Sequence, residues 1–384
     1  MSSTLSETEL GQSSLTQRRI LLFFIPLAVS WIFMSVEGPV TAGIITRRGG
    51  EQAGLAGLAL LVSLAIFIES PVIDLLTTST TLSRTHAAYL QIRRFTAMLM
   101  LWVASIQALV SLTPFYWVLI ERVIGAEHDV AVVLRPAMIV MIPWAAMVGW
   151  RRFLHGVLIR FDNTKPVGIG TSVRVISIVG FCLGLYEWTS IPGLTVAAIA
   201  MVAGVSCETL FIHLVSRPTI RRCLDPMVGT DEDKGLPMNE LWHFHYPLTL
   251  ATMTMILSMP LISAALARSP DSVRMLAAWG LAQGTMFLFR SVTFALPETV
   301  VALYRDTETR ARLSEFCTRV GIVCGIAVLL AYFSGAANWF FRVVLDGKPE
   351  IVVLSALALL VTVLVPVVNA RGALFRGLLA AHRE

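Results

Sequence analysis

Ten runs of apolar residues, each long enough to cross a bilayer, dominate this sequence. A hydrocarbon core about 30 Å thick takes about 20 residues of α-helix, whereas the strands of a membrane barrel give short alternating segments. The runs here are long and do not alternate, and only 14% of the residues are charged, against about a quarter in soluble domains. The sequence therefore predicts an all-α polytopic membrane protein.

The predicted spans fall into a group of six and a group of four, separated by one charged segment. The spans are Ile20–Ile45, Ala53–Thr78, Phe95–Leu112, Val130–Val148, Val167–Tyr186, Leu194–Val215, Leu241–Ala267, Met275–Leu303, Phe316–Tyr332 and Ile351–Ala370. Residues 216–239 combine turn-forming residues with basic and acidic side chains, which is typical of a solvated loop. We therefore expect a tail at 1–19, an N-lobe at 20–215, an inter-lobe linker at 216–239 and a C-lobe at 240–384.

Two segments of the N-lobe depart from simple spans. The first span contains Pro26 and Glu37-Gly38-Pro39, and because proline removes a helical hydrogen bond, we expect a long and kinked helix. Ser79–Arg94, between the second and third spans, mixes apolar and basic residues. This mixture predicts a helix that lies on an anionic membrane surface.

Lysine and arginine residues are distributed unequally between the loops of the two sides. The side of the N-terminus carries more of them, including Arg18, Arg19 and Arg371, than the side that carries Arg47 and Arg122. Because basic loops stay inside, both termini are expected to be cytoplasmic, in an inner or plasma membrane. The same distribution accounts for the net charge of +5. We therefore expect membrane lipids as partners and no nucleic acid.

The second half of the chain repeats the first at a distance of 221 residues. Aligning Ile20–Phe95 with the segment 221 positions later, without a gap, gives 15 identities in 76 positions. The matches include prolines and loop arginines, which apolar composition alone rarely aligns. They include Phe23/Phe244, Pro26/Pro247, Leu27/Leu248, Pro39/Pro260, Arg47/Arg268, Ser70/Ser291, Arg84/Arg305 and Phe95/Phe316. Six spans separate equivalent points, so both copies have one orientation, as in transporters with parallel repeats and a substrate site between the lobes.

The repeat places an acid and a base at equivalent positions. Glu69 lies near the end of the apolar run Leu55–Asp74, and Arg290 takes its place in Leu276–Ala295. Ionisable groups in the hydrocarbon are costly and normally face a bundle interior or a wet cavity. We therefore expect Glu69 and Arg290 to point into an inter-lobe cavity, where their ion pair would act as a gate. The alternative is a static salt bridge within one lobe.

Five further ionisable residues in the spans are weaker candidates for a substrate or ion pathway. Glu37 adjoins the kink, where it could hold a proton or a cation, or only snorkel to the surface. Asp74 lies about 140° around the helix from the acid of the predicted gate and could equally be an interfacial carboxylate. Arg174 could attract an anionic substrate, although its short distance from a loop favours snorkelling. Glu208 and Glu298 lie closer to span ends.

The sequence lacks the common motifs of enzyme and metal chemistry. It contains no GxxxxGK[ST], GxSxG or HExxH pattern, so it gives no support to an ATPase, a hydrolase or a metalloprotease. The five cysteines have neither CxxC nor metal-ligand spacing, and we expect them to be reduced packing residues. His243 and His245 point to different faces of a helix. We therefore expect no enzyme, no cofactor and no metal site.

Three stretches resemble the multidrug/oligosaccharidyl-lipid/polysaccharide exporter (MOP) superfamily. They are FFIPLAVSWIFMSVEGPVTAGIITRRGG, LAGLALLVSLAIFIESPVIDLL and RRFLHGVLIRFDNTKPVGIGTSVR. The spacing of Pro26-Leu27, Ala42–Ile44 and Ser70-Pro71 is most similar to the progressive-ankylosis-type or MATE-like branch. The resemblance implies two helical lobes around a V-shaped cavity, alternating access by rocking, and export or flipping driven by an ion gradient or by the gradient of the substrate.

The chain departs from the family pattern in two places. Members of the multidrug branch carry an Asp in the first helix, and here Gly38 falls at that position with Glu37 as the nearest acid. The resemblance also implies twelve core spans, whereas ten are predicted. Either the last two spans are dispensable, or another subunit covers the flank of the C-lobe.

The function predicted from these features is secondary transport by alternating access. The protein would be an exporter or flippase for an organic anion, a drug-like molecule or a lipid-linked substrate, with H⁺ or Na⁺ as the candidate coupling ion. The alternative is a membrane scaffold that keeps the fold and transports nothing. An anion exporter would line its cavity with arginine, whereas a lipid-linked substrate needs a lateral opening.

Overall fold

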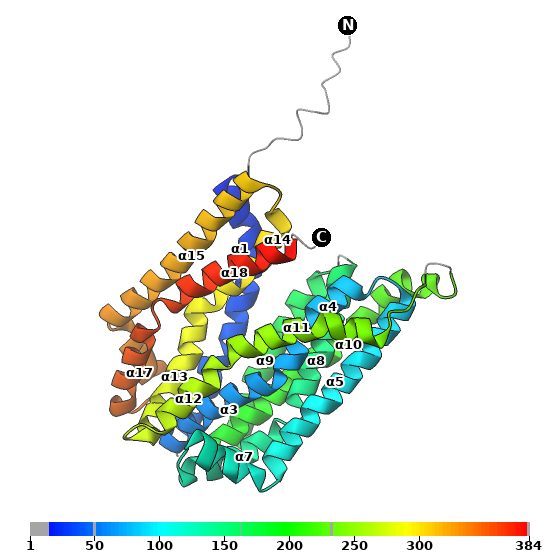
Figure 1. Cartoon of the computed structure of the whole chain (residues 1–384). Coiled ribbons are helices and arrows are strands. Elements are labelled where there is room, and N and C mark those ends of the chain that lie inside the picture. Colours follow the sequence, from blue (N-terminus) through cyan, green and yellow to red (C-terminus); the bar gives the residue numbers. More distant parts are fainter. Residues whose placement is uncertain (1–14, 49–50, 162, 231–232, 382–384) are drawn as a thin grey trace. The chain divides into compact units, whose positions relative to one another are not determined.

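The computed structural model describes residues 15–48, 51–161, 163–230 and 233–381. Within these ranges the chain forms helices joined by loops, without a β-strand (Figure 1). Eight helices are long and apolar enough to cross a membrane, and two helix pairs, bent by 42° and 40°, raise the number to ten if each pair forms one span. The prediction of an all-α protein with about ten spans is confirmed.

The helices follow the predicted spans in order. The first six spans and the connections between them contain α1 (Gln17–Ser35), α2 (Glu37–Arg47), α3 (Glu51–Ile73), α4 (Leu75–Leu82), α5 (His86–Leu112), α6 (Phe115–Trp117), the π-helix η1 (Val118–Ile124), α7 (His128–Val140), α8 (Trp144–Arg160), α9 (Lys165–Trp188) and α10 (Gly193–Cys223). After the 3-10 turn η2 (Asp225–Met227) come α11 (Met238–Ile256), α12 (Ser258–Ala267), α13 (Ser272–Arg290), the 3-10 helix η3 (Ser291–Ala295), α14 (Leu296–Leu303), α15 (Thr307–Phe333), α16 (Ala336–Trp339), the π-helix η4 (Phe340–Val344), α17 (Pro349–Val361) and α18 (Val365–Ala381).

The 221-residue repeat covers all of α1–α8. Both bounds shift by 221 between α5 and α15, between α7 and α17, and between α8 and α18. The π-helices η1 and η4 occupy equivalent positions, and each is followed at the same place by a residue of positive φ, Gly125 at 89° and Asp346 at 55°. The predicted duplication is confirmed. Within the described residues, α9 and α10 have no counterpart.

The chain packs as two compact units. Unit 1 takes the described residues up to Ser35, with Met286–Ala336 and the residues from Leu359 on, and unit 2 takes Val36–Thr285 and Ala337–Ala358. Within unit 1, α14 and α15 pack on α18, and α1 packs on η3. The rings of Phe24 and Phe316 meet edge to face, 5.3 Å apart, in its apolar core. Unit 1 therefore joins the first helix to parts of the second copy.

Unit 2 is organised around α8. This helix packs on α4, α5 and α10, and α10 packs in turn on α9. Part of the second copy also belongs to unit 2, where α11 packs on α3. The Ser63 and Ser263 hydroxyls lie 2.8 Å apart, and a Cβ on Gly38 would lie 2.6 Å from the Gly284 Cα. Because such a contact excludes a side chain, glycine lets the two copies approach backbone to backbone there.

The prediction of a separate surface helix over Ser79–Arg94 is wrong. The helix α4 continues the second span to Leu82, and α5 begins at His86 and runs through the third span to Leu112. The break between them is short because the Thr85 hydroxyl accepts a hydrogen bond from the Ala88 N–H at 3.2 Å and so caps α5. The basic residues of this segment therefore project from the start of a span.

Candidate functional site

A break in the first span places a carboxylate inside unit 2. The helix is interrupted at Val36, in agreement with the predicted kink, and α2 begins at Glu37. The Glu37 carboxylate lies 2.6 Å from Nη2 of Arg174 on α9, and the two side chains are 13% and 7% exposed. The Arg174 guanidinium also lies over the Trp144 ring, 5.3 Å from its centroid. Arg174 therefore forms a buried ion pair. The expectation that its side chain would snorkel to the membrane surface is wrong.

Glu69, on α3, has a neutral hydrogen-bond donor as its closest polar partner. Trp144, the first residue of α8, donates a hydrogen bond from Nε1 to the Glu69 carboxylate at 2.5 Å. Among the described residues, Glu69 has no cationic partner within 4 Å. The positive charges that act on it from farther away are Arg152, Arg151 and Arg174. Trp144 thus connects Glu69 to Arg174 by contacting both.

A second buried ion pair joins α8 to α10. Nη1 of Arg151 lies 2.5 Å from Oε2 of Glu208, and the side chains are 5% and 0% exposed. His155 follows Arg151 by one turn, and its Nε2 lies 3.9 Å from Oε1 of Glu208, too far for a hydrogen bond. Within the described part of the chain, neither of these two atoms has a hydrogen-bond partner. A carboxylate oxygen and a ring nitrogen are therefore left unbonded side by side.

We call these side chains the ionic cluster. Its members are Glu37, Glu69, Arg151, Arg152, His155, Arg174 and Glu208, contributed by α2, α3, α8, α9 and α10 of unit 2. Three carboxyl groups and three guanidinium groups thus lie within membrane-crossing helices, where each unpaired charge costs several kcal/mol. The gain or loss of one charge would shift the balance of the whole cluster, which is the chemistry that an ion-responsive site requires.

Solved structures of membrane transporters match almost the whole chain. The lipid II flippase MurJ in an inward closed conformation aligns with a TM-score of 0.69 and 9% identity, over 93% of this chain and 76% of that chain. The MATE multidrug transporter DinF-BH aligns with a TM-score of 0.65 and 14% identity, over 97% and 86% of the two chains. An inward-facing multidrug resistance MATE family transporter of the MOP superfamily aligns with a TM-score of 0.62 and 14% identity, over 93% and 85%.

The fold is that of the MATE transporters and MurJ. No protein-family model matches the chain, and no curated protein matches it either. At identities of 9% and 14% the similarity consists in the arrangement of the helices. The predicted resemblance to the exporter superfamily is therefore confirmed for the fold.

Arg290 ends α13 in unit 1 and has aromatic surroundings. Its guanidinium lies 5.5 Å from the ring centroid of Phe287 and 5.7 Å from that of Phe294. Such contacts stabilise a cation by about 0.5 to 2 kcal/mol. Glu69 belongs to unit 2, so the predicted approach of Glu69 and Arg290 stays a prediction.

Asp74 and Glu298 both lie at the starts of short helices. Asp74 precedes α4, and Glu298 is exposed in the first turn of α14, where the helix dipole favours an acid. His245 of α11 reaches the break between α3 and α4, where Asp74 lies. Its Nε2 donates to the Pro71 carbonyl at 2.8 Å, and its Nδ1 lies 2.8 Å from Oγ1 of Thr78. A buried histidine thus ties the second copy to the break between α3 and α4.

Sequence reasoning missed the α8 half of the ionic cluster. It ended the fourth span at Val148, which left Arg151 and Arg152 outside the membrane, and it gave Glu208 little weight because Glu208 lies close to the end of a span. The helix α8 continues to Arg160 instead. The spacing of Arg151 and His155, four residues apart and hence on one helical face, is a signal that could have revealed the site.

The structure offers no metal centre among the residues it describes. His243 and His245 point apart, because Nδ1 of His243 bonds the Asn239 carbonyl at the surface while His245 is buried. All five cysteines are free, and Cys182, Cys317 and Cys324 are buried, as expected of packing residues.

Proposed function

We propose that the chain is a secondary transporter, an exporter or flippase that moves an organic anion, a drug-like molecule or a lipid-linked substrate by alternating access. The ionic cluster carries this proposal, because burying several charges in membrane helices has a high cost that a passive scaffold has no reason to bear. The solved structures of the same fold include a multidrug transporter and a lipid II flippase, which supports this class of function.

In this proposal the ionic cluster responds to the coupling ion. Glu69 is the carboxylate of the ionic cluster that forms no ion pair with another described residue, so we assign to it the coupling proton, with Na⁺ as the other candidate. A change in its charge acts on Arg174 and, through Trp144, on the position of α8. Glu37 holds Arg174 in place during this change.

The N-lobe and the C-lobe alternate between two arrangements in the proposed cycle. Arg290 attracts an anionic substrate group or Glu69, and Asp74 and Glu298 belong to the same pathway. Both termini are cytoplasmic, and the protein lies in an inner or plasma membrane among lipids, which the excess of basic residues in the loops of one side supports. The linker at 216–239 then lies in the cytoplasm.

Flux through liposomes that contain the purified protein tests the proposal. The probes are a fluorescent drug-like dye, a fluorescent organic anion and a fluorescent lipid, each with and without a pH gradient. Glu69→Gln and Arg290→Ala are expected to lower the rate for the transported probe at least about tenfold, which corresponds to about 1.4 kcal/mol. Glu315→Gln, which removes the exposed partner of Arg319, is the matched control and should leave the rate unchanged.

Two outcomes would contradict the proposal. If the parent protein moves none of the three probes, the scaffold alternative replaces the transporter. If the parent transports a probe and both variants match its rate, the gate formed by Glu69 and Arg290 is wrong. Thermal unfolding in detergent accompanies each flux measurement, so that loss of folded protein is separated from loss of transport.

A further inference from the structure

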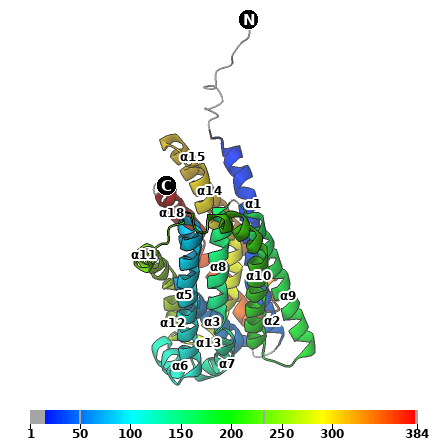
Figure 2. The ribbon, with the colours of Figure 1, turned by 90° about the vertical axis from the view of Figure 1, so that its right-hand side faces the viewer.

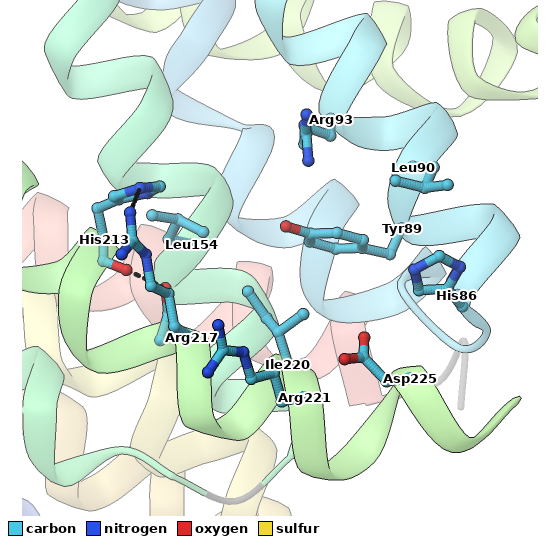
Figure 3. A pocket seen from close by; sticks show the side chains of 11 residues that line it. His86, Tyr89, Leu90, Arg93, Leu154, His213, Arg217, Ile220, Arg221 and Asp225 are labelled. Carbon is cyan, nitrogen blue, oxygen red and sulfur yellow. Dashed lines mark hydrogen bonds between the residues drawn. The ribbon is translucent and has the colours of Figure 1, made fainter. Parts of the chain in front are cut away.

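A pocket of about 320 Å³ opens in unit 2 where α5 begins and α10 ends. Its walls come from the first two turns of α5, from α8 and from the last turns of α10, three helices that lie side by side (Figure 2). Its polar lining includes His86, Tyr89, Arg93, His213, Arg217, Arg221 and Asp225 (Figure 3). None of them belongs to the ionic cluster, so the proposed transport function does not use them.

The pocket holds more positive charge than its own acids balance. Three arginines line it, Arg93 on the α5 side and Arg217 and Arg221 on the α10 side, whereas Asp225 is the single acidic residue of the lining (Figure 3). Within the described ranges, none of these arginines forms an ion pair. Asp233, from the following loop, is outside the pocket lining, and its carboxylate accepts a hydrogen bond from the Ala87 N–H at the start of α5, at 2.6 Å. Counted over the three arginines and Asp225 of the lining, two positive charges stay uncompensated.

The hydrogen bonds of His213 leave a donor free in the same place. Trp150 points Nε1–H at Nδ1 of His213, 3.3 Å away, and Arg217 points an N–H at its Nε2, 3.1 Å away. A neutral imidazole accepts at only one of its nitrogens, because the other carries the proton. When Nε2 carries the proton, the Arg217 N–H has no acceptor on this ring, and an anion bound in the pocket would supply one.

The length of the span that ends at the pocket indicates the depth of the pocket in the membrane. The span that ends here, Gly193–Met227, has 35 residues. At about 1.5 Å per residue it is about 52 Å long, against about 30 Å for the hydrocarbon core. Its last turns, with Arg217 and Arg221, therefore extend past the core. In the proposed topology this end is cytoplasmic, where anionic lipids concentrate.

We propose that this pocket binds a phosphate monoester group, the chemistry shared by a phosphatidic acid headgroup and a soluble phosphate ester. The two uncompensated charges match a dianion, and guanidinium groups bind phosphate oxygens in a two-pronged geometry. The Tyr89 hydroxyl points into the pocket from α5 as a further donor (Figure 3). Leu90, Leu154 and Ile220 form an apolar wall for the carbon part of the ligand. The volume lies at the lower end of the range for small-molecule pockets.

Binding of a short-chain phosphatidic acid to the full chain in detergent tests the proposal. The dissociation constant is measured for the parent, for Arg93→Gln/Arg221→Gln and for Arg94→Gln. The double variant is expected to bind at least about tenfold more weakly, because it loses charge-assisted hydrogen bonds. Arg94, also exposed on α5 but outside the pocket lining, is the matched control and should keep the parent affinity. Arg93→Lys keeps the positive charge but loses the paired N–H donors of the guanidinium group. Its affinity should lie between those of the parent and the double variant.

Two further probes identify the source of the phosphate. Displacement of the lipid by inorganic phosphate at a similar concentration assigns the site to soluble phosphate esters, whereas retention of the lipid assigns it to the headgroup. The proposal is overturned if the double variant binds the lipid with the affinity of the parent. It is also overturned if Arg94→Gln loses as much affinity as the double variant, because general surface charge would then explain the binding. Equal binding of a diacylglycerol of the same chain length overturns it as well. These outcomes do not depend on flux, so they are distinct from failure of the transport proposal.

Discussion

The two copies of the repeat share their helices but not their buried charges. Their helix bounds coincide after a shift of 221, and their fourth spans bend by 42° and 40°. Charged or polar positions of the first copy correspond to different residues in the second: Glu37 to Ser258, Glu69 to Arg290, Trp144 to Val365, Arg151 to Gly372 and Arg152 to Ala373. Arg174 and Glu208 lie on α9 and α10, which lack a counterpart within the described residues. The copies therefore have packing in common and differ in chemistry.

One shared feature connects the copies reciprocally inside unit 2. Nη2 of Arg47 donates to the Val344 carbonyl at 2.6 Å, and Nη2 of Arg268 donates to the Val123 carbonyl. Arg268 is the repeat counterpart of Arg47, and Val344 is the counterpart of Val123. Each copy thus uses the same arginine to bind the end of the π-helix of the other copy. We call this pair of contacts the arginine clasp.

The largest change in the free energy of unfolding is expected for substitutions in the ionic cluster, where the two copies differ. Glu208→Gln leaves Arg151 buried without its partner, which should lower the free energy of unfolding by about 3 to 5 kcal/mol. The double variant Arg151→Met/Glu208→Leu removes both charges and should recover most of that loss. Denaturant unfolding in detergent measures both. A loss below about 1 kcal/mol for Glu208→Gln would show that water or a mobile partner already screens this pair.

The next largest loss of stability is expected at a close helix contact that both copies share. Gly156 and Gly377 are counterparts, and a Cβ at each would lie 2.5 Å from the Leu76 carbonyl oxygen and 2.6 Å from Cβ of Val300, respectively. Alanine at either position should therefore cost about 1 to 3 kcal/mol by overpacking. Gly372→Ala is the control, because nothing lies within 4 Å of its added carbon. Stabilities are compared by thermal unfolding, and a neutral result at one glycine alone would mean that the two crossings are not equivalent.

A smaller effect is expected from the arginine clasp. Arg47→Gln and Arg268→Gln each remove the exposed, charge-assisted hydrogen bond of the clasp, which should cost about 1 kcal/mol. Arg47→Gln also removes a bond to the Gly43 carbonyl, so its cost should be at least as large as that of Arg268→Gln. Arg122→Gln, at an exposed arginine of η1, is the control. Spin labels on α2 and η4 report the distance between the two elements. An unchanged distance distribution in the double variant would show that the clasp does not hold these elements together.

The sequence was sufficient for the parts of the fold that depend on composition and on repeated local signals. Apolar run length predicted the spans, the matched Pro39 and Pro260 predicted the duplication, and the Glu37-Gly38-Pro39 segment predicted a break that the structure places at Val36. The ionic cluster was only partly predictable, because the partner of a buried side chain depends on the rotation of each helix. Arg174 was expected at the surface because it lies a short distance from a loop. Its pairing with Glu37 follows from tertiary packing alone.

The smallest effect concerns the helix caps of α5 and α15, which use the same repeat position with different chemistry. Thr85 caps α5, whereas the Asp306 carboxylate caps α15 by accepting from the Thr309 N–H at 2.8 Å. That hydrogen bond lowers the pKa of Asp306 below its ordinary value of 3.8. A depressed pKa contributes stability that is present above the ordinary value and is lost as the pH falls through the folded-state pKa.

Hydrogen exchange of the first-turn amides of α15 checks this cap. Protection there should decrease as the pH falls below about 3.8, once the intrinsic pH dependence of exchange is subtracted, while protection at the start of α5 should not change in this way. Asp306→Thr gives α15 the cap chemistry of α5 and should abolish the difference between the two helices. If the variant keeps the acid-dependent loss of protection, another group at the start of α15 titrates, and the cap is not its cause.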